Sequence, residues 1–382
     1  MSATTHQAIT DRSQSGTLSM RWIISAREDL VWFVGSVLSS YALLVLYVSG
    51  LIPLVWMVGA WAVLIDAPHV FGTFSRTYFD RTERRTRSRL LWGSLLFFVV
   101  GPLMVLAGIG LIFFFVAALW AYYHLVKQHY GFMVLYKKKN DDLVKIDNLL
   151  DRMFLMLAFT YPFVAFIASD PEAMQRVPVK LHSGIGAVAM LLLYATILAG
   201  TVWVIRQVQR ALFGQSLNIP KYLLLAAAIP MHWIVLLTPM PHKTIAIVAI
   251  LTIYHNLQYH RLIWFHNKKY KTLESAPPAR TAEATVTEGI KPQATQEDLR
   301  NMYGAAELIS RRLIYYIAFG VLFGFWYQLP RQYMRAAFGE TTTLTQLVAS
   351  FFWGYAFIHY YLDSKIWRVR RDPEVGRALQ MG

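Results

Sequence analysis

Histidine and aspartate side chains recur near one end of four apolar segments of the sequence. The motif Tyr-His-x4-His occurs twice, in YHLVKQH (123–129) and in YHNLQYH (254–260). Two other segments pair histidine with a carboxylate, DAPH (66–69) and HYYLD (359–363). Ionisable side chains at membrane depth are energetically costly and are typical of functional sites when they face the interior of a helix bundle. We therefore predict that eight side chains are metal ligands: Asp66, His69, His124, His129, His255, His260, His359 and Asp363.

Helix geometry restricts which of these side chains can meet. Asp66 and His69 are three residues apart, which places both on one face of a helix. The same holds for His359 and Asp363, which are four residues apart. The two histidines of each Tyr-His-x4-His motif lie about 140° apart around an ideal helix. They can converge if the helix end is distorted by a π-bulge, or if they serve different metals or opposite sides of one site.

The types of donor restrict the metal. The chain has no cysteine, which excludes thiolate-ligated haem and iron–sulfur clusters held by this chain. Imidazole and carboxylate ligands suit iron, zinc or manganese, and open coordination positions suit non-haem iron that reacts with dioxygen. Because eight groups exceed the needs of one ion, we predict an iron centre with two ions. Neighbouring side chains that could orient the ligands are Tyr123, Gln128, Tyr254, Gln258 and Tyr360.

The elements that position these side chains are predicted to be membrane helices. Of the 382 residues, 56% are hydrophobic and 15% are charged, and several apolar runs approach the roughly 20 residues that span a bilayer. We predict an all-α, polytopic membrane protein whose single membrane domain covers 29–371, with a flexible polar arm (1–28), a disordered cytoplasmic loop (272–300) and a C-terminal tail (372–382). About ten transmembrane helices are expected, at 30–49, 51–73, 90–107, 109–131, 146–169, 183–205, 221–239, 243–265, 312–329 and 343–366.

Basic residues are concentrated in alternate loops. The stretches SRTYFDRTERRTRSR (75–89), HNKKYK (266–271) and KIWRVRR (365–371) fall on one side, and loops such as TPMPHK (238–243) fall on the other. The positive-inside rule then places both termini and the histidine-bearing helix ends in the cytoplasm. Loop asymmetry explains the net charge of +15 without a nucleic-acid partner. We expect an integral protein of a bacterial inner membrane, with its site facing the cytoplasm.

Some polar residues are interpreted as structural. Asp147 and Asp151 lie one turn apart at the start of the fifth predicted helix, with no histidine nearby. We expect them to balance the charges of Lys145 and Arg152. His232, in IPMHW, is expected to form a hydrogen bond within the helix bundle.

The histidine motifs resemble those of known membrane enzymes. The His-x4-His pairs at predicted helix ends resemble the first histidine box of integral-membrane fatty-acid desaturases and hydroxylases. QHYGF (128–132) is similar to the His-Tyr-Gly element of membrane alkane hydroxylases. A more distant likeness is to the bacterial carotene-cleaving membrane dioxygenases. The resemblance covers these short motifs, and the chain has no His-x2-His-His box. It implies an iron centre that activates dioxygen against a lipophilic substrate.

Three functional hypotheses follow. The preferred one is an integral-membrane oxidase or oxygenase, with two irons and dioxygen as co-substrate, that hydroxylates, desaturates or cleaves a lipophilic substrate entering from the lipid bilayer. Because the chain lacks a nucleotide-binding Gly-rich loop, a reaction that consumes electrons would require a separate ferredoxin or reductase. The first alternative is a haem protein for membrane electron transfer, with histidines as axial ligands. The second is a transporter in which histidine and aspartate relay protons or bind a transported metal.

Overall fold

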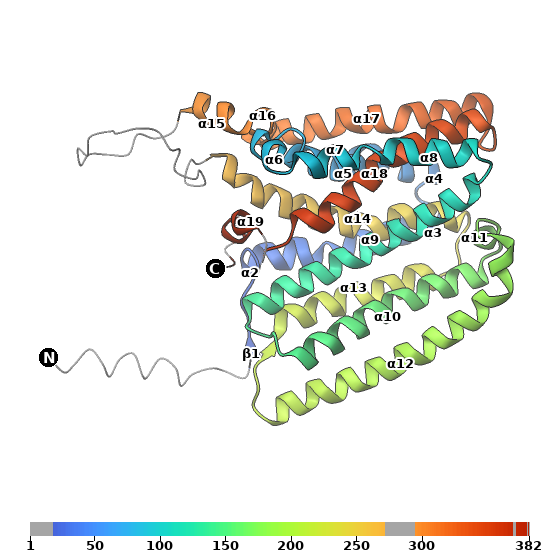
Figure 1. The fold of residues 1–382 in the computed structure, drawn as a ribbon. Helices are drawn as coiled ribbons and strands as arrows, with labels where there is room; N and C mark the ends of the chain where they lie inside the picture. Colours follow the sequence, from blue (N-terminus) through green and yellow to red (C-terminus); the bar gives the residue numbers. More distant parts are fainter. Residues whose placement is uncertain (1–17, 272–294, 370–371, 380, 382) are drawn as a thin grey trace, which may run out of the picture. The chain divides into compact units, whose positions relative to one another are not determined.

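Two compact units make up the computed structural model, which describes residues 18–271, 295–369, 372–379 and 381 (Figure 1). The first unit contains Met1–Val48 and Tyr123–Leu251, and the second contains Ser49–Tyr122 and Thr252–Gly382. Two helices, α9 (Gly110–Lys139) and α14 (Lys243–His266), begin in one unit and end in the other. Neither unit is therefore a single stretch of sequence.

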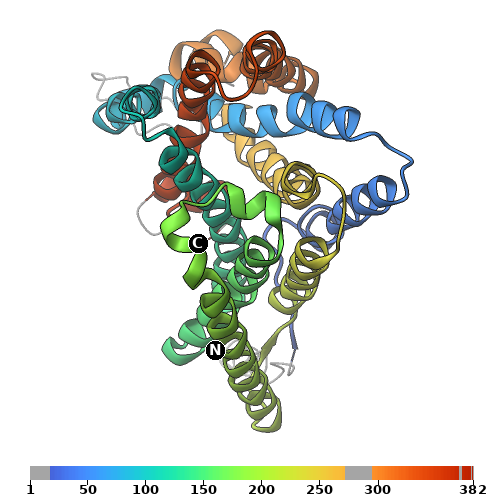
Figure 2. The ribbon, with the colours of Figure 1, turned by 90° about the vertical axis from the view of Figure 1, so that its right-hand side faces the viewer.

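The first unit is a helical bundle with one pair of very short strands. Helix α10 packs against α12 and α13, and Figure 2 gives a second view, turned by 90° from that of Figure 1. The two strands pair in parallel, with Leu18 opposite Leu217. Besides its parts of α9 and α14, the unit contains β1 (Leu18–Ser19), α2 (Ala26–Glu28), η1 (Asp29–Gly35), α3 (Val37–Val48), α10 (Lys145–Ser169), α11 (Pro171–Gln175), η3 (Val179–Leu181), α12 (His182–Leu212), β2 (Leu217–Asn218) and α13 (Ile219–Leu237).

The second unit contains the remaining helices. Helix α18 packs most extensively against α8, and α17 packs against both α5 and α18. Its elements are α4 (Leu54–Trp61), η2 (Ala62–Asp66), α5 (Ala67–Arg76), α6 (Arg81–Thr86), α7 (Ser88–Ser94), α8 (Phe97–Leu106), η4 (Asn267–Lys271), α15 (Gln296–Tyr303), α16 (Ala305–Arg311), α17 (Leu313–Phe338), α18 (Thr343–Ile366) and α19 (Pro373–Ala378), together with parts of α9 and α14.

Two segments that the sequence predicts to be flexible contain folded structure. The chain is folded from Leu18 on, and the backbone N–H of Ile23 donates to the Asp29 carboxylate at 2.7 Å. Residues 296–300 of the predicted loop begin α15, where Thr295 and Asp298 form a capping box that satisfies the first backbone donors. The rest of these predictions, residues 1–17 and 272–294, lies outside the described residues.

The prediction of an all-α protein is confirmed, and the helices suggest a membrane protein. Within the described residues, eight helical segments are long and apolar enough to cross a membrane: Ala26–Val48, Leu54–Arg76, Ser88–Leu106, Gly110–Lys139, Lys145–Ser169, Val179–Leu212, Ile219–Leu237 and Leu313–Phe338. Helices α14 and α18, which correspond to the eighth and tenth predicted spans, have 24 residues each but are less apolar because they carry many of the polar side chains discussed below. The number of spans and the cytoplasmic position of the termini stay predictions.

Glycines allow α17 to approach its neighbours closely in the second unit. A Cβ atom added at Gly324 would lie 2.3 Å from the carbonyl oxygen of Val63 in η2. A Cβ atom at Gly320 would lie 2.8 Å from the side chain of Pro68 in α5. Because atoms cannot approach this closely, a larger residue at either position would push α17 away. These contacts fix the segment from which His69 projects.

A buried network of charged side chains joins four helices in the first unit. The Lys221 ammonium donates to Asp142 at 2.9 Å and to Asp151 at 3.2 Å. Lys137 also donates to Asp151, and Arg210 donates to Asp142 at 2.8 Å. All five residues are almost completely buried. Each charge therefore has a partner of opposite sign, which buried charges require.

Asp147 and Asp151 do not pair with the partners predicted from the sequence. Asp147 accepts a hydrogen bond from Arg206 at 2.7 Å, and Asp151 binds the two lysines of the network. Both carboxylates lie on the buried face of α10, whereas Lys145 and Arg152 are exposed. Residues one or two positions apart point to different sides of a helix, so the partners come from neighbouring helices instead.

The first unit is expected to lose stability in acid. Burial raises the pKa of Asp142, but the charges of Lys221, Lys137 and Arg210 together lower it further, so that the net pKa lies below the usual 3.8. A carboxylate with a depressed folded-state pKa stabilises the fold above its unfolded pKa and loses this contribution as the pH falls through the folded-state value. We expect thermal unfolding temperatures of the wild type to drop below about pH 5. Asp142→Asn should be less stable at neutral pH and change less in acid. Parallel curves for the two proteins would assign the acid sensitivity to other groups.

Candidate metal centre

Four buried histidines bring their ring nitrogens together. One ligand atom of each lies within 4.8 Å of those of the other three, and the residues are His69, His124, His255 and His359. We call this set the histidine cluster. His69, His255 and His359 belong to the second unit, and His124 follows that unit's last residue in α9, Tyr122, by two positions along the same unbroken helix. Four of the eight predicted ligands therefore meet, and the buried cluster is compatible with a metal site.

Distances within the second unit fit ligands of one ion. His69 Nε2 and His255 Nε2 are 3.2 Å apart. Two nitrogens that each lie about 2.1 Å from one ion are about 3.0–3.4 Å apart when they are neighbours in octahedral or tetrahedral coordination. The ring centroid of His359 lies 4.5 Å from that of His69. These three imidazoles are close enough to share an ion.

A π-helical turn precedes His69. η2 joins α4 to α5, and Pro68 occupies the first turn of α5. Proline has no N–H to donate to the preceding turn, and a wider π turn accommodates this loss. Every residue of α5 is buried. A π-bulge is expected in the Tyr-His-x4-His helices if their two histidines converge, whereas this π turn lies in the segment that carries Asp66 and His69.

A group of three side chains, Thr73, Tyr259 and Asp363, lies behind His359. Thr73 Oγ1 is 2.7 Å from His359 Nδ1 and donates to Asp363 Oδ1 at 2.8 Å. The Tyr259 hydroxyl donates to the same carboxylate oxygen at 2.8 Å and lies 2.7 Å from Thr73 Oγ1. Asp363 Oδ2 is 3.7 Å from His359 Nδ1. We call these three residues the Thr73 group; through it, Asp363, predicted as a ligand, contacts the far side of a cluster histidine.

Thr73 and Tyr259 are not among the site residues predicted from the sequence. A signal was nonetheless present, because Thr73 follows His69 by four residues and Tyr259 follows His255 by four residues. Residues four apart share a helix face, so a hydrogen-bonding side chain at this spacing lies beside the ligand. Asp363 follows His359 at the same spacing.

Asp66 belongs to a different set of hydrogen bonds. The side-chain amide of Asn256 donates to Asp66 Oδ1 at 3.2 Å and accepts from Trp61 Nε1 at 3.1 Å. Asn256 directly follows His255 in α14, so this set connects α14 to the α4–η2 segment. Asp66 is outside the group of converging ligand atoms.

His260 uses both ring nitrogens for contacts with protein. Its Nδ1 lies 3.0 Å from the Tyr316 hydroxyl, and its Nε2 lies 3.0 Å from the carbonyl oxygen of Ile65. The angle of about 140° between positions five residues apart accounts for this placement. His255 faces the cluster, and His260 faces a neighbouring surface of η2 and α17.

His129 lies among side chains of the first unit. Its ring centroid is 5.3 Å from Phe159 and 5.5 Å from His232. His129 Nδ1 is 3.0 Å from the carbonyl oxygen of Leu125, and His232 Nδ1 is 2.9 Å from that of Ala228, each within its own helix. His124 and His129 thus separate as His255 and His260 do.

The five predicted neighbours of the ligands have different environments. Tyr360 lies beside the cluster, with its ring centroid 5.5 Å from that of His359. The others are Tyr254 and Gln258, which are buried, Gln128, which is half-buried, and Tyr123, which is exposed.

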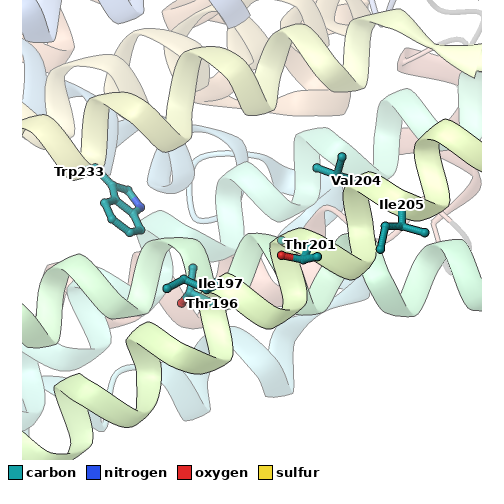
Figure 3. A pocket seen from close by; sticks show the side chains of 7 residues that line it. Thr196, Ile197, Thr201, Val204, Ile205 and Trp233 are labelled. Atoms are coloured by element: carbon teal, nitrogen blue, oxygen red, sulfur yellow. The ribbon is translucent and has the colours of Figure 1, made fainter.

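An open groove of about 480 Å³ lies on the first unit between α12 and α13 (Figure 3). Its lining includes no histidine or carboxylate, so the groove offers no metal ligands of these types. Apolar walls on two helices that could cross a membrane suit contact with hydrocarbon. The lining residues are Thr196, Ile197, Gly200, Thr201, Val204, Ile205 and Trp233.

Comparisons with known proteins give no match: none among protein-family models, none among curated proteins and none among solved structures. They do not identify a desaturase-like or hydroxylase-like family. The geometry of the histidine cluster is therefore the main guide to function.

Proposed function

We propose that this protein is an integral-membrane, iron-dependent oxidoreductase that uses dioxygen to oxidise a lipophilic substrate. The buried histidine cluster is the observation that carries the proposal. Its imidazoles have no thiolate beside them, a donor set that suits iron among several metals. Iron with nitrogen ligands and open positions supplies the chemistry of dioxygen activation.

The spread of the cluster supports one ion rather than the two that the sequence predicts. Two ligands of one ion, each about 2.1 Å from it, can be at most about 4.2 Å apart. The four ligand atoms lie within 4.8 Å, so a small contraction would bring all of them onto one ion. The prediction of two ions depended on eight ligands, and the other four have the contacts described above.

The same arrangement is less suitable for haem. Porphyrin occupies four positions around its iron and leaves the protein the axial ones. Four converging imidazoles exceed that number. We therefore rank a haem centre below a non-haem one.

The surroundings of the cluster favour a lipophilic substrate. Phe71, Ile263 and Ile309 form an apolar group with Tyr259 and Tyr316 in the second unit. Such a group excludes water from the adjacent polar atoms and is compatible with a substrate that arrives from the bilayer. We propose that a separate ferredoxin or reductase supplies electrons if the reaction consumes them. The cytoplasmic side is proposed from the loop charges alone.

The test compares the purified protein loaded with iron and with zinc. Metal is removed by a chelator in detergent, each metal is added back, and metal per chain is measured by mass spectrometry. Oxygen consumption is then followed with a fatty acyl lipid, an alkane, a sterol-like lipid and a carotenoid, each without and with an added ferredoxin, ferredoxin reductase and NADPH. Zinc is the matched control because it occupies nitrogen sites without redox chemistry.

We expect about one iron per chain and oxygen consumption, with one class of lipid, that zinc does not support. Folded protein that binds neither metal would overturn the metal site. Iron binding without oxygen consumption, or equal turnover with zinc, would overturn the oxidoreductase assignment and leave the site intact.

A further inference from the structure

Hydrogen bonds on the far side of His359 determine which of its nitrogens can bind a metal. We infer that Thr73, held in place by Asp363 and Tyr259, is a positioning residue that keeps the His359 proton on Nδ1 and leaves Nε2 as the ligand atom. The inference rests on the metal site of the proposed function, and it adds residues to that site. A neutral imidazole carries one proton, so a proton on Nδ1 is required for ligation through Nε2.

The Asp363 carboxylate matters because the Thr73 hydroxyl has one proton to donate. The hydroxyl has one proton and three polar neighbours, His359 Nδ1 at 2.7 Å, Tyr259 OH at 2.7 Å and Asp363 Oδ1 at 2.8 Å. If the proton points to Asp363, Thr73 Oγ1 accepts from His359 Nδ1–H. If it points to His359, the ring carries its proton on Nε2 and cannot bind metal there. The hydroxyls of Thr73 and Tyr259 both donate to Asp363 Oδ1, which makes this oxygen the common acceptor and favours the first arrangement.

Tyr259 helps to hold Asp363 in this role. The Tyr259 hydroxyl donates to Asp363 Oδ1 at 2.8 Å, which holds the carboxylate from a third helix. Because Thr73 and Tyr259 both donate to this one oxygen, a rotation of the Asp363 side chain would break both hydrogen bonds.

The same four-residue spacing occurs on all three helices. His69, His255 and His359 are each followed, four residues later, by one member of the Thr73 group. Each helix therefore contributes one cluster histidine and one positioning side chain on the same face. A shift of any one helix would move its cluster histidine and its positioning side chain together. The orientation of His359 is therefore linked to the packing of α5 and α14.

The experiment measures cobalt(II) binding, in which visible absorption reports the ligands of the metal. We expect Thr73→Val to weaken binding by about 10–100-fold, the usual cost of losing an outer hydrogen-bond partner. Thr73→Ser keeps the hydroxyl and should retain wild-type binding and spectrum. Asp363→Asn should resemble Thr73→Val, because an amide accepts less strongly than a carboxylate and can donate to Thr73 Oγ1. Tyr259→Phe should have a smaller effect, since Thr73 still donates to Asp363.

Thr77→Val is the matched control. Thr77 is also fully buried, lies one turn after Thr73, and its hydroxyl donates at 2.7 Å to the Thr73 carbonyl oxygen rather than to a histidine. Its substitution should leave cobalt binding and the spectrum unchanged. A loss of binding equal to that of Thr73→Val would indicate a general packing effect and overturn the inference.

A double variant separates positioning from structure. If Thr73 acts through His359, then Thr73→Val should weaken cobalt binding no further in protein that already carries His359→Ala. Additive losses, or wild-type binding by Thr73→Val alone, would overturn the inference while leaving the metal site in place. A wild type that binds neither cobalt nor iron would overturn both proposals.

Discussion

Alanine at His69 or His255 is expected to weaken metal binding by more than about 100-fold, and substrate-dependent oxygen consumption should fall with it. The two Nε2 atoms are 3.2 Å apart, so each variant removes one of two adjacent nitrogens. The loss should exceed the about 10–100-fold that removal of an outer partner costs, because a direct ligand disappears. Metal per chain, measured by mass spectrometry after equilibration with iron, checks the result. Circular dichroism of the same samples confirms that the helices are retained.

His260→Ala is the control on the same helix as His255. Its ring nitrogens contact Tyr316 and Ile65, so its loss should leave the metal content unchanged. His129→Ala serves the same purpose for the first unit. Loss of metal from either control would favour the larger, two-ion site predicted from the sequence. Retention of metal in the His69 and His255 variants would place the metal elsewhere.

Asp151→Ala is expected to destabilise the first unit by about 3–5 kcal/mol, the usual effect of removing one partner from a buried ion pair. The variant leaves the ammonium groups of Lys137 and Lys221 with one fewer carboxylate, and both lysines are fully buried. It also removes the acceptor for Trp203 Nε1, which donates to Asp151 at 2.7 Å. Unfolding in mixed detergent, followed by tryptophan fluorescence, measures the change.

Two further variants test whether the loss of stability comes from the buried charge network. Arg21→Ala removes an exposed pair with Asp141 and should cost less than about 1 kcal/mol. Replacing Lys137 by methionine and Asp151 by leucine in one protein should cost less than Asp151→Ala, because fewer charges remain unpaired. If Asp151→Ala is no worse than Arg21→Ala, the network contributes little to stability.

The sequence contains most of the information about element type and part of the information about the site. Apolar runs of membrane length predict helices because a bilayer requires satisfied backbone groups. The recurrence of histidine near one end of four runs predicts that the histidines meet. The sequence does not show how each helix is rotated about its own axis. His124 and His129, like His255 and His260, share a motif, and the structure separates the members of each pair.

Carboxylates near a ligand cannot be assigned from spacing alone. Asp363 lies four residues after His359, which predicts a shared face but not whether the oxygen reaches the metal or the far side of the ring. Its contacts with Thr73 and Tyr259 decide between these roles. Thr73 itself is one of two hydroxyl residues in α5, with Ser75, and a buried threonine in a helix is common without function. Its role depends on residues nearly 200 and nearly 300 positions away.

The interleaving of the two units has a consequence for biosynthesis. Chains are made from the N-terminus, and helices become available in that order. His69 is made early, His124 and His255 follow, and His359 arrives with α18, the last long helix of the described residues. The second unit thus begins at Ser49 but cannot be completed until α18 has been synthesised. A chain that stalls or is clipped before α18 lacks one of the four histidines as well as Asp363, so a complete histidine cluster can form only after α18 has been made.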